Sequence, residues 1–72
     1  MQWLWRARLR RRVLVNLKDD ATQALRGVLW NQRGRWFVLR QADLLKLGAE
    51  PTPLDGEVIV HVTNIAFYQE LP

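Results

Sequence analysis

The stretch that decides the fold is VLVNLKDDATQALRGVLWNQRGRWFVLR, residues 13–40. It contains three short apolar runs that are separated by polar segments. In the first run the apolar residues Val13, Val15 and Leu17 alternate with residues of mixed polarity, as they do in a half-buried strand. The last run is rich in aromatic and β-branched types, which are enriched in strands. The stretch therefore predicts three successive strands, over residues 13–18, 24–30 and 36–40.

Polar residues and glycines mark the turns and bends of this stretch. Asp19 and Asp20 end the first strand as a turn. Gly34 supplies the positive φ that the next turn needs. Gly27 lies inside the second strand, where a glycine indicates a bulge or a sharp bend. A small β-barrel needs such a bend in order to close.

The second half of the chain begins with a predicted connector over residues 42–56, because two prolines and two glycines there disfavour a long regular element. Two further strands are expected, over residues 57–62 and 65–69, with a turn at Thr63 and Asn64. Five short strands with closely spaced turns predict an all-β fold, a small barrel or a sandwich.

Residues 1–10, MQWLWRARLR, are compatible with two structures. The odd positions from Trp3 to Leu9 are apolar, whereas Gln2, Arg6, Arg8 and Arg10 are polar, which is the period of a strand. Leu, Ala, Arg and Gln are nevertheless good helix formers, and Trp5 and Leu9 would share one helical face. We expect a short helix. The chain then divides into an arm, residues 1–10, and a barrel, residues 11–72.

The size of the chain predicts self-association. Its 72 residues form one domain, and a domain this small buries only about 60% of its unfolded surface. The sequence has no Cys and a single His, His61, so neither disulfides nor a Cys- or His-rich metal site can support it. No cofactor is expected. Oligomerisation is the remaining route to stability.

The net charge of +4 comes from the N-terminal arm. The first twelve residues hold five arginines and no acid, whereas the other sixty hold six Lys or Arg against seven Asp or Glu. Any contact with a polyanion is therefore expected at the arm. The arginines concerned are Arg6, Arg8, Arg10, Arg11 and Arg12.

Catalysis and membrane insertion are not expected. The sequence contains no Ser, no Cys and no phosphate-cradling glycine loop. No apolar run approaches the roughly 18 residues that cross a bilayer, and Arg6 interrupts the short apolar opening that a signal peptide would extend. We expect a non-enzymatic protein of the cytoplasm.

The order of these segments resembles the Sm/LSm family of small barrels, to which Hfq-like proteins belong. VLVNLKDD, then LRGVL and WFVL, is similar to the first Sm motif, and GEVIVHVTNIAFY, residues 56–68, is similar to the second. The resemblance implies a strongly bent, five-stranded antiparallel barrel of the SH3-like kind with a short helix ahead of it. It also implies that strand four of one subunit pairs with strand five of the next, in rings of about five to seven copies. The interface residues that it implies are Val58, Val60, Ile65, Phe67 and Tyr68.

The resemblance also locates the family's RNA pocket. That pocket uses an Asp and an Asn in the turn between strands two and three, and an Arg-Gly pair after strand four. Neither acid nor amide stands at those turn positions here, and His61 and Val62 replace the Arg-Gly pair. Only Asn64 remains. The resemblance therefore implies a vestigial pocket of His61 and Asn64.

Both ends of the chain are similar to those of small Sm-like proteins encoded by phages of actinobacteria. The opening WLWR, the strand GEVIV and the closing FYQELP carry this similarity. It implies a virion structural or assembly component, for example of the head or portal region. The protein would then lie in the host cytoplasm or the virion.

The roles of the arm and of two other features stay open. Trp3, Trp5 and the arm arginines suit nucleic-acid binding, docking on an acidic protein surface, or simple cover for one end of the barrel. Arg33 and Arg35 form a second basic contact point at a turn tip. His61 is either a pH switch or ligand contact, or a structural residue.

These observations predict a ring-forming interaction module that docks a larger protein partner through its arm. The alternative is an RNA- or DNA-binding ring in which the arm contacts phosphates. The two differ in salt dependence, because binding through several arginines weakens steeply as salt rises.

Overall fold

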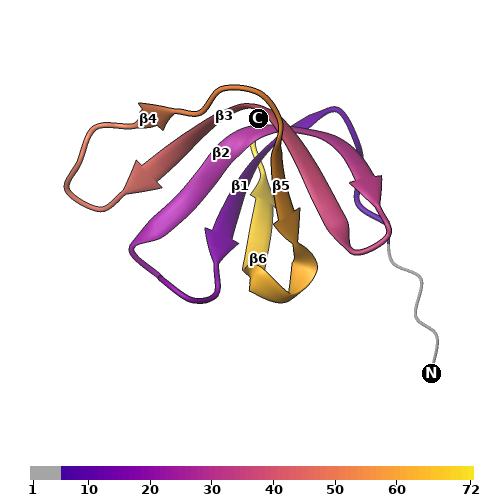
Figure 1. Ribbon diagram of the computed structural model, residues 1–72, viewed down its shortest axis with the longest axis horizontal. Helices are drawn as coiled ribbons and strands as arrows, with labels where there is room; N and C mark the ends of the chain where they lie inside the picture. The colour runs from indigo at the N-terminus through magenta and orange to yellow at the C-terminus, as the bar shows by residue number, and fades with distance from the viewer. Residues whose placement is uncertain (1–5) are drawn as a thin grey trace.

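Six antiparallel strands make up the computed structural model, which describes residues 6–72 (Figure 1). The strands are β1 (Arg11–Leu17), β2 (Gln23–Arg33), β3 (Trp36–Lys46), β4 (Thr52–Pro53), β5 (Val58–His61) and β6 (Ile65–Glu70). A single 3₁₀ turn, η1 (Val62–Asn64), joins β5 to β6. The prediction of an all-β antiparallel fold is confirmed. No helix among the described residues is long and apolar enough to span a membrane.

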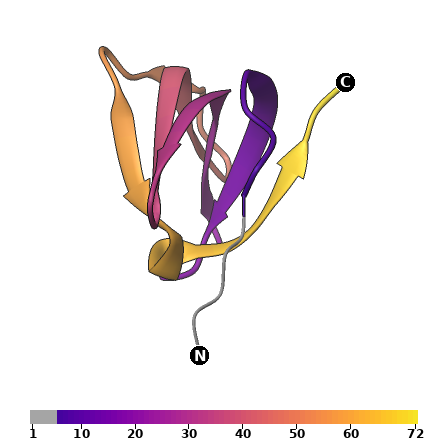
Figure 2. The same ribbon diagram turned by 90° about the vertical axis from the view of Figure 1, so that its right-hand side faces the viewer.

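The strand order is β4-β3-β2-β1-β6, with β5 also paired to β3. Strand β3 has room for two partners because Trp36–Leu39 pairs with β5, whereas Asp43 and Leu44 pair with β4. No pairing joins β5 to β6 within residues 6–72, so the sheet curls without closing (Figure 2). A single chain therefore forms an open, bent sheet.

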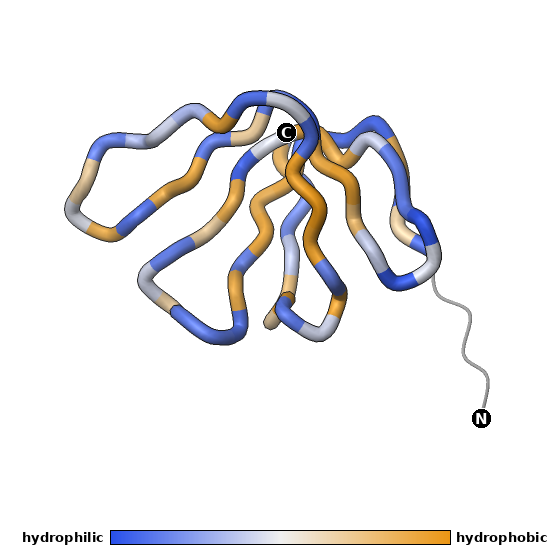
Figure 3. Tube along the Cα trace, in the orientation of Figure 1, coloured by the Kyte–Doolittle hydropathy of each residue, from blue (hydrophilic) through white to orange (hydrophobic). Residues whose placement is uncertain are grey.

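The core lies on the inner face of the curled sheet, where apolar side chains alternate with outward-facing polar ones. Apolar segments of the chain accordingly run along the strands (Figure 3). Burying such a side chain contributes about 1.5–3 kcal/mol. The packed cluster consists of Val13, Val15, Leu25, Leu29, Phe37, Leu39, Ala42 and Val60.

The predicted bend at Gly27 is confirmed, because the register of the β2–β3 pair shifts between Arg26 and Val28. Gly34 has the expected positive φ, 58°. The predicted connector is wrong at its start, since β3 continues to Lys46. Leu44 pairs there with Leu25, so β2 provides a partner that the local composition does not reveal.

The expected N-terminal helix is not found in residues 6–10, and residues 1–5 lie outside the described part of the chain. Arg10 has a φ of +63°, which ends any helix. Its N–H donates to the carbonyl of Leu29, and the N–H of Ala7 donates to Oε1 of Gln32. Bonds to β2 thus replace the bonds that a helix would make within itself.

Candidate functional site

The last two strands leave two free sheet edges. Strand β5 has a partner only in β3, and β6 has a partner only in β1, within residues 6–72. An unpaired edge presents a row of backbone N–H and C=O groups that can pair with another strand. These two edges are the candidate functional site.

Antiparallel pairing alternates, so one known hydrogen bond shows which backbone groups of an edge strand face outward. The N–H of Val62 donates to the carbonyl of Arg35 over 2.8 Å. By alternation, Val60 directs its backbone groups toward β3, whereas Ile59 and His61 direct theirs away from the sheet. The free edge of β5 is therefore formed by Ile59 and His61.

The same reasoning applies to β6. The N–H of Leu71 donates to the carbonyl of Arg12 over 2.8 Å, so Gln69 directs its backbone groups toward β1. The backbone groups of Tyr68 and Glu70 then face outward. Each edge thus offers two residues whose groups are directed away from the sheet.

Large apolar side chains are exposed along these edges. Ile59 on β5 is 50% exposed, Phe67 on β6 is 58% exposed, and Trp36, which pairs with His61, is 47% exposed. Among residues 6–72, only Leu9 and Leu47 are comparable. Exposed apolar side chains beside an unpaired edge are typical of a contact surface.

The edge formed by β4 is different. It is two residues long, and one of them, Pro53, has no N–H to donate. Pro51 precedes it. Short edges that carry proline resist strand addition. Strand pairing with another chain is therefore favoured at β5 and β6.

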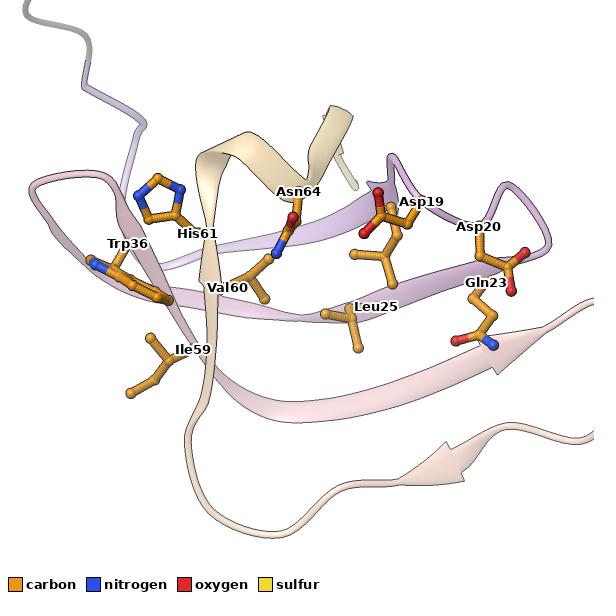
Figure 4. Close-up of a pocket in the computed structure, with 10 residues that line it drawn as sticks. Asp19, Asp20, Gln23, Leu25, Trp36, Ile59, Val60, His61 and Asn64 are labelled. Carbon is orange, nitrogen blue, oxygen red and sulfur yellow. The ribbon is translucent and has the colours of Figure 1, made fainter.

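A pocket of about 350 Å³ lies between β5 and the β1–β2 turn (Figure 4). It brings His61 and Asn64, the expected vestigial pocket, together with Trp36. Apolar side chains line its middle, and the carboxylates of the β1–β2 turn lie at one side (Figure 4). The lining residues are Leu17, Asp19, Asp20, Gln23, Leu25, Trp36, Ile59, Val60, His61 and Asn64.

His61 has a structural role in this pocket. Its Nδ1 accepts a hydrogen bond from the backbone N–H of Thr63 over 3.2 Å and lies 2.8 Å from the Thr63 hydroxyl. Its ring meets Trp36 edge-on, with 4.7 Å between the ring centroids. His61 thereby caps η1 at the point where the chain leaves β5.

Asp20 stabilises the β1–β2 turn. The hydroxyl and the backbone N–H of Thr22 both donate to its carboxylate, and these bonds lower the pKa of Asp20. The carboxylate therefore stays charged beside the pocket at neutral pH. The expected turn at Asp19 and Asp20 is confirmed.

Two arm arginines make contacts with other residues of the same chain. Arg8 forms a two-pronged ion pair with Glu70, with N–O distances of 2.7 and 3.1 Å. The Nε of Arg10 donates to the carbonyl of Trp30, and its guanidinium lies 3.8 Å from the centre of the Trp30 ring. Ala7, which precedes Arg8, packs against the core. Part of the arm thus covers one end of the sheet.

The remaining predicted contact arginines are exposed and form no ion pair within residues 6–72. Arg6, Arg11 and Arg12 belong to the arm and the start of β1, and Arg33 and Arg35 stand at the β2–β3 turn. Trp3 and Trp5 lie outside the described residues. The structure also reveals Arg40, which was not expected. Its guanidinium lies 4.2 Å from the Trp30 ring centre, and it pairs with Glu57.

The predicted interface residues differ in how they are placed. Val60 is buried in the core, and Val58, Ile65 and Tyr68 are half-buried against it. Only Phe67 is exposed. Ile59 was not among the expected interface residues, although alternation along β5 indicates it, because Val58 and Val60 both face inward.

Within residues 6–72 no three His, Cys, Asp or Glu side chains come together as metal ligands would. Searches of family models, curated proteins and solved structures found no match to this chain.

Proposed function

We propose that the chain is a non-enzymatic interaction module that assembles into a ring through its β5 and β6 edges. The observation that carries this proposal is that the two free edges belong to different strands at opposite ends of one sheet. A strand edge on one copy can then pair with the other edge on the next copy.

Such a contact is head-to-tail, because the two paired surfaces differ. Head-to-tail contacts form a closed ring when the rotation between copies returns to its start. In a closed ring every β5 edge has a β6 partner, and only the short, proline-containing β4 edge stays unpaired. Within residues 6–72 both edges are unpaired, so closure provides hydrogen-bond partners that this part of one copy does not.

The side chains favour the same contact. Pairing of β6 with β5 brings a new strand beside Ile59, and it brings Phe67 beside a neighbouring subunit. Trp36 lies one strand further from the contact, on β3 next to His61. All three are about half exposed in the single chain. Apolar burial contributes about 25 cal/mol for each Å² removed from water. Backbone pairing would set the geometry, and these side chains would add affinity.

The ring would be of the Sm type. The observed order places the last two strands, β5 and β6, at the two sides of the sheet, where the resemblance requires strands four and five. About five to seven copies are then expected. We propose a structural or assembly role, such as that of a phage virion component, with the arm docking a larger protein.

A ring that binds RNA or DNA is the second candidate. The observation that favours it is the set of exposed arginines without an ion pair in the described chain: Arg6, Arg11, Arg12, Arg33 and Arg35. Nuclease-treated protein should keep bound nucleic acid only under this alternative. Its release on raising the salt concentration, followed by absorbance, would identify phosphate contacts.

Disulfide cross-linking tests the proposed interface with no background, because the native chain has no Cys. Antiparallel pairing of the outward-facing groups places Ile59 opposite either Tyr68 or Glu70 of the next copy. Ile59→Cys is therefore combined with Tyr68→Cys in one variant and with Glu70→Cys in another. Paired residues there have Cα atoms about 5.5 Å apart, which a disulfide can bridge.

One of these double variants should give a covalent ladder that extends beyond the dimer on oxidation. Ile59→Cys alone is the control and can link two chains at most. Absence of a ladder in both double variants, together with the native mass of one chain, would overturn the proposal.

A further inference from the structure

His61 stands at the junction of the two proposed assembly edges. It is the last residue of β5, and it caps the three-residue turn η1 that leads directly into β6. Because η1 is the direct connection between β5 and β6, its conformation contributes to how the two strands are placed relative to each other. The ring geometry depends on that placement, because each edge must meet the other edge of the next copy.

The cap depends on the protonation state of the ring. Nδ1 of His61 accepts from the N–H of Thr63, so the neutral ring carries its hydrogen on Nε2. Protonation places a hydrogen on Nδ1 as well and removes its acceptor capacity. The cation can still donate to the Thr63 hydroxyl, which is 2.8 Å away. The Thr63 N–H, however, loses its partner, and η1 loses its cap.

The charged residues nearest to the His61 pocket and to η1 belong to two turns. Asp19 and Asp20 line the same pocket from the β1–β2 turn. Lys18 in the same turn donates its backbone N–H to the carbonyl of Asn64, and Arg35 in the β2–β3 turn accepts from the N–H of Val62 through its carbonyl. Trp36 covers one side of the ring.

We propose that protonation of His61 releases η1 and weakens ring assembly, so that His61 acts as a pH switch between the two edges. The inference rests on the proposed ring. His is the side chain whose charge ordinarily changes between about pH 5 and 8, and the chain has only one. Assembly should therefore be complete above this range and weakest at its lower end.

Two substitutions separate the charge from the cap. His61→Asn keeps a side-chain acceptor that caps well but does not titrate. His61→Lys carries a permanent charge in this range and offers no acceptor. Native mass is measured by light scattering across the pH range for the wild type and both variants. We expect a several-fold fall toward 8.5 kDa, the mass of one chain, in the wild type.

The His61→Asn variant should stay assembled throughout, and His61→Lys should be small at every pH. A wild-type ring that keeps its mass at both ends of the range overturns the switch and leaves the ring intact. A His61→Asn ring that dissociates like the wild type also overturns it.

A wild type with the mass of one chain at every pH overturns the ring instead. The turn is then examined by NMR, because the Thr63 amide reports the cap directly. Movement of its signal in step with His61 protonation, absent in His61→Asn, supports the switch within η1. A Thr63 amide signal that ignores His61 protonation rejects it.

Discussion

Gly27 in β2 lies so close to Ala42 in β3 that a Cβ atom on Gly27 would stand 3.0 Å from the Cα of Ala42. The same atom would lie 2.9 Å from the carbonyl oxygen of Arg40, a distance that real Cβ atoms essentially never show. The two strands approach this closely where their register shifts, between Arg26 and Val28. The absence of a side chain at Gly27 thus permits the bend that curls the sheet.

Gly27→Ala should therefore destabilise the fold, because the atoms that it meets belong mainly to backbone and cannot turn away. We expect a loss of about 1–3 kcal/mol, as for overpacking of a core, measured by urea unfolding. Gly34→Asn is the control. A Cβ atom on Gly34 would meet nothing within 4 Å, and the φ of Gly34 is +58°, a conformation that Asn tolerates. Equal unfolding midpoints for the two variants would contradict this account.

The same substitution at two phenylalanines should have different effects. Phe37 is fully buried and meets the Tyr68 ring edge-on at 5.4 Å, whereas Phe67 is 58% exposed. Phe37→Leu should cost about 1 kcal/mol or more, because it removes an aromatic pair and leaves space in the core. Phe67→Leu should change the stability of the unassembled chain by no more than about 0.5 kcal/mol. Denaturant unfolding in dilute solution compares them, and a reversed order would contradict the assigned core.

The Arg8–Glu70 ion pair should make stability depend on pH. The hydrogen bond from Arg8 lowers the pKa of Glu70 below its ordinary value of 4.5. Folding then favours the charged carboxylate, and this contribution is present above about pH 4.5 and lost as the pH falls through the lowered pKa. Glu70→Gln should be less stable than the wild type at neutral pH and should converge with it in acid. Thermal unfolding at several pH values measures the difference.

Glu50→Gln is the matched control for that experiment. Glu50 is exposed and has no ion-pair partner within residues 6–72, so its neutralisation should change stability little at any pH. A Glu70→Gln variant that behaves like Glu50→Gln would show that the ion pair does not hold the arm to β6.

Local patterns in the sequence predict much of this fold. Alternation locates β1, and Gly27 and Gly34 locate a bend and a turn, because each depends on residues within a few positions. The end of β3 and the arm depend instead on distant partners. Leu44 is in a strand because Leu25 is beside it, and Arg8 is fixed by Glu70, 62 positions away.

The candidate site can be predicted only in part, because some of its features also depend on residues that are distant in sequence. His61 and Asn64 are close in sequence and both line one pocket. Val60 is buried in the core, whereas Ile59 is exposed at the edge. This difference depends on which face of β5 is turned toward the core. The stacking of Arg10 and Arg40 near Trp30 joins three segments. The periodicity of the sequence along any one strand does not predict these contacts.

A proline on the free edge of β5 should block assembly without unfolding the chain. The N–H of Ile59 faces away from β3, and a proline is tolerated in an edge strand at such a position. Ile59→Pro should therefore keep the fold, seen by circular dichroism, and lose the ring. Ile59→Ala is the control, because it shortens the side chain and retains the N–H. Loss of assembly in both variants alike would indicate that the side chain, and not strand pairing, makes the contact.

The most direct test of the central claim is the native mass of the wild-type chain at neutral pH, measured by light scattering over a range of concentrations. The account predicts one assembly with a mass that is a whole multiple of 8.5 kDa, larger than a dimer and free of higher aggregates. A stable species of 8.5 kDa at every concentration would contradict it.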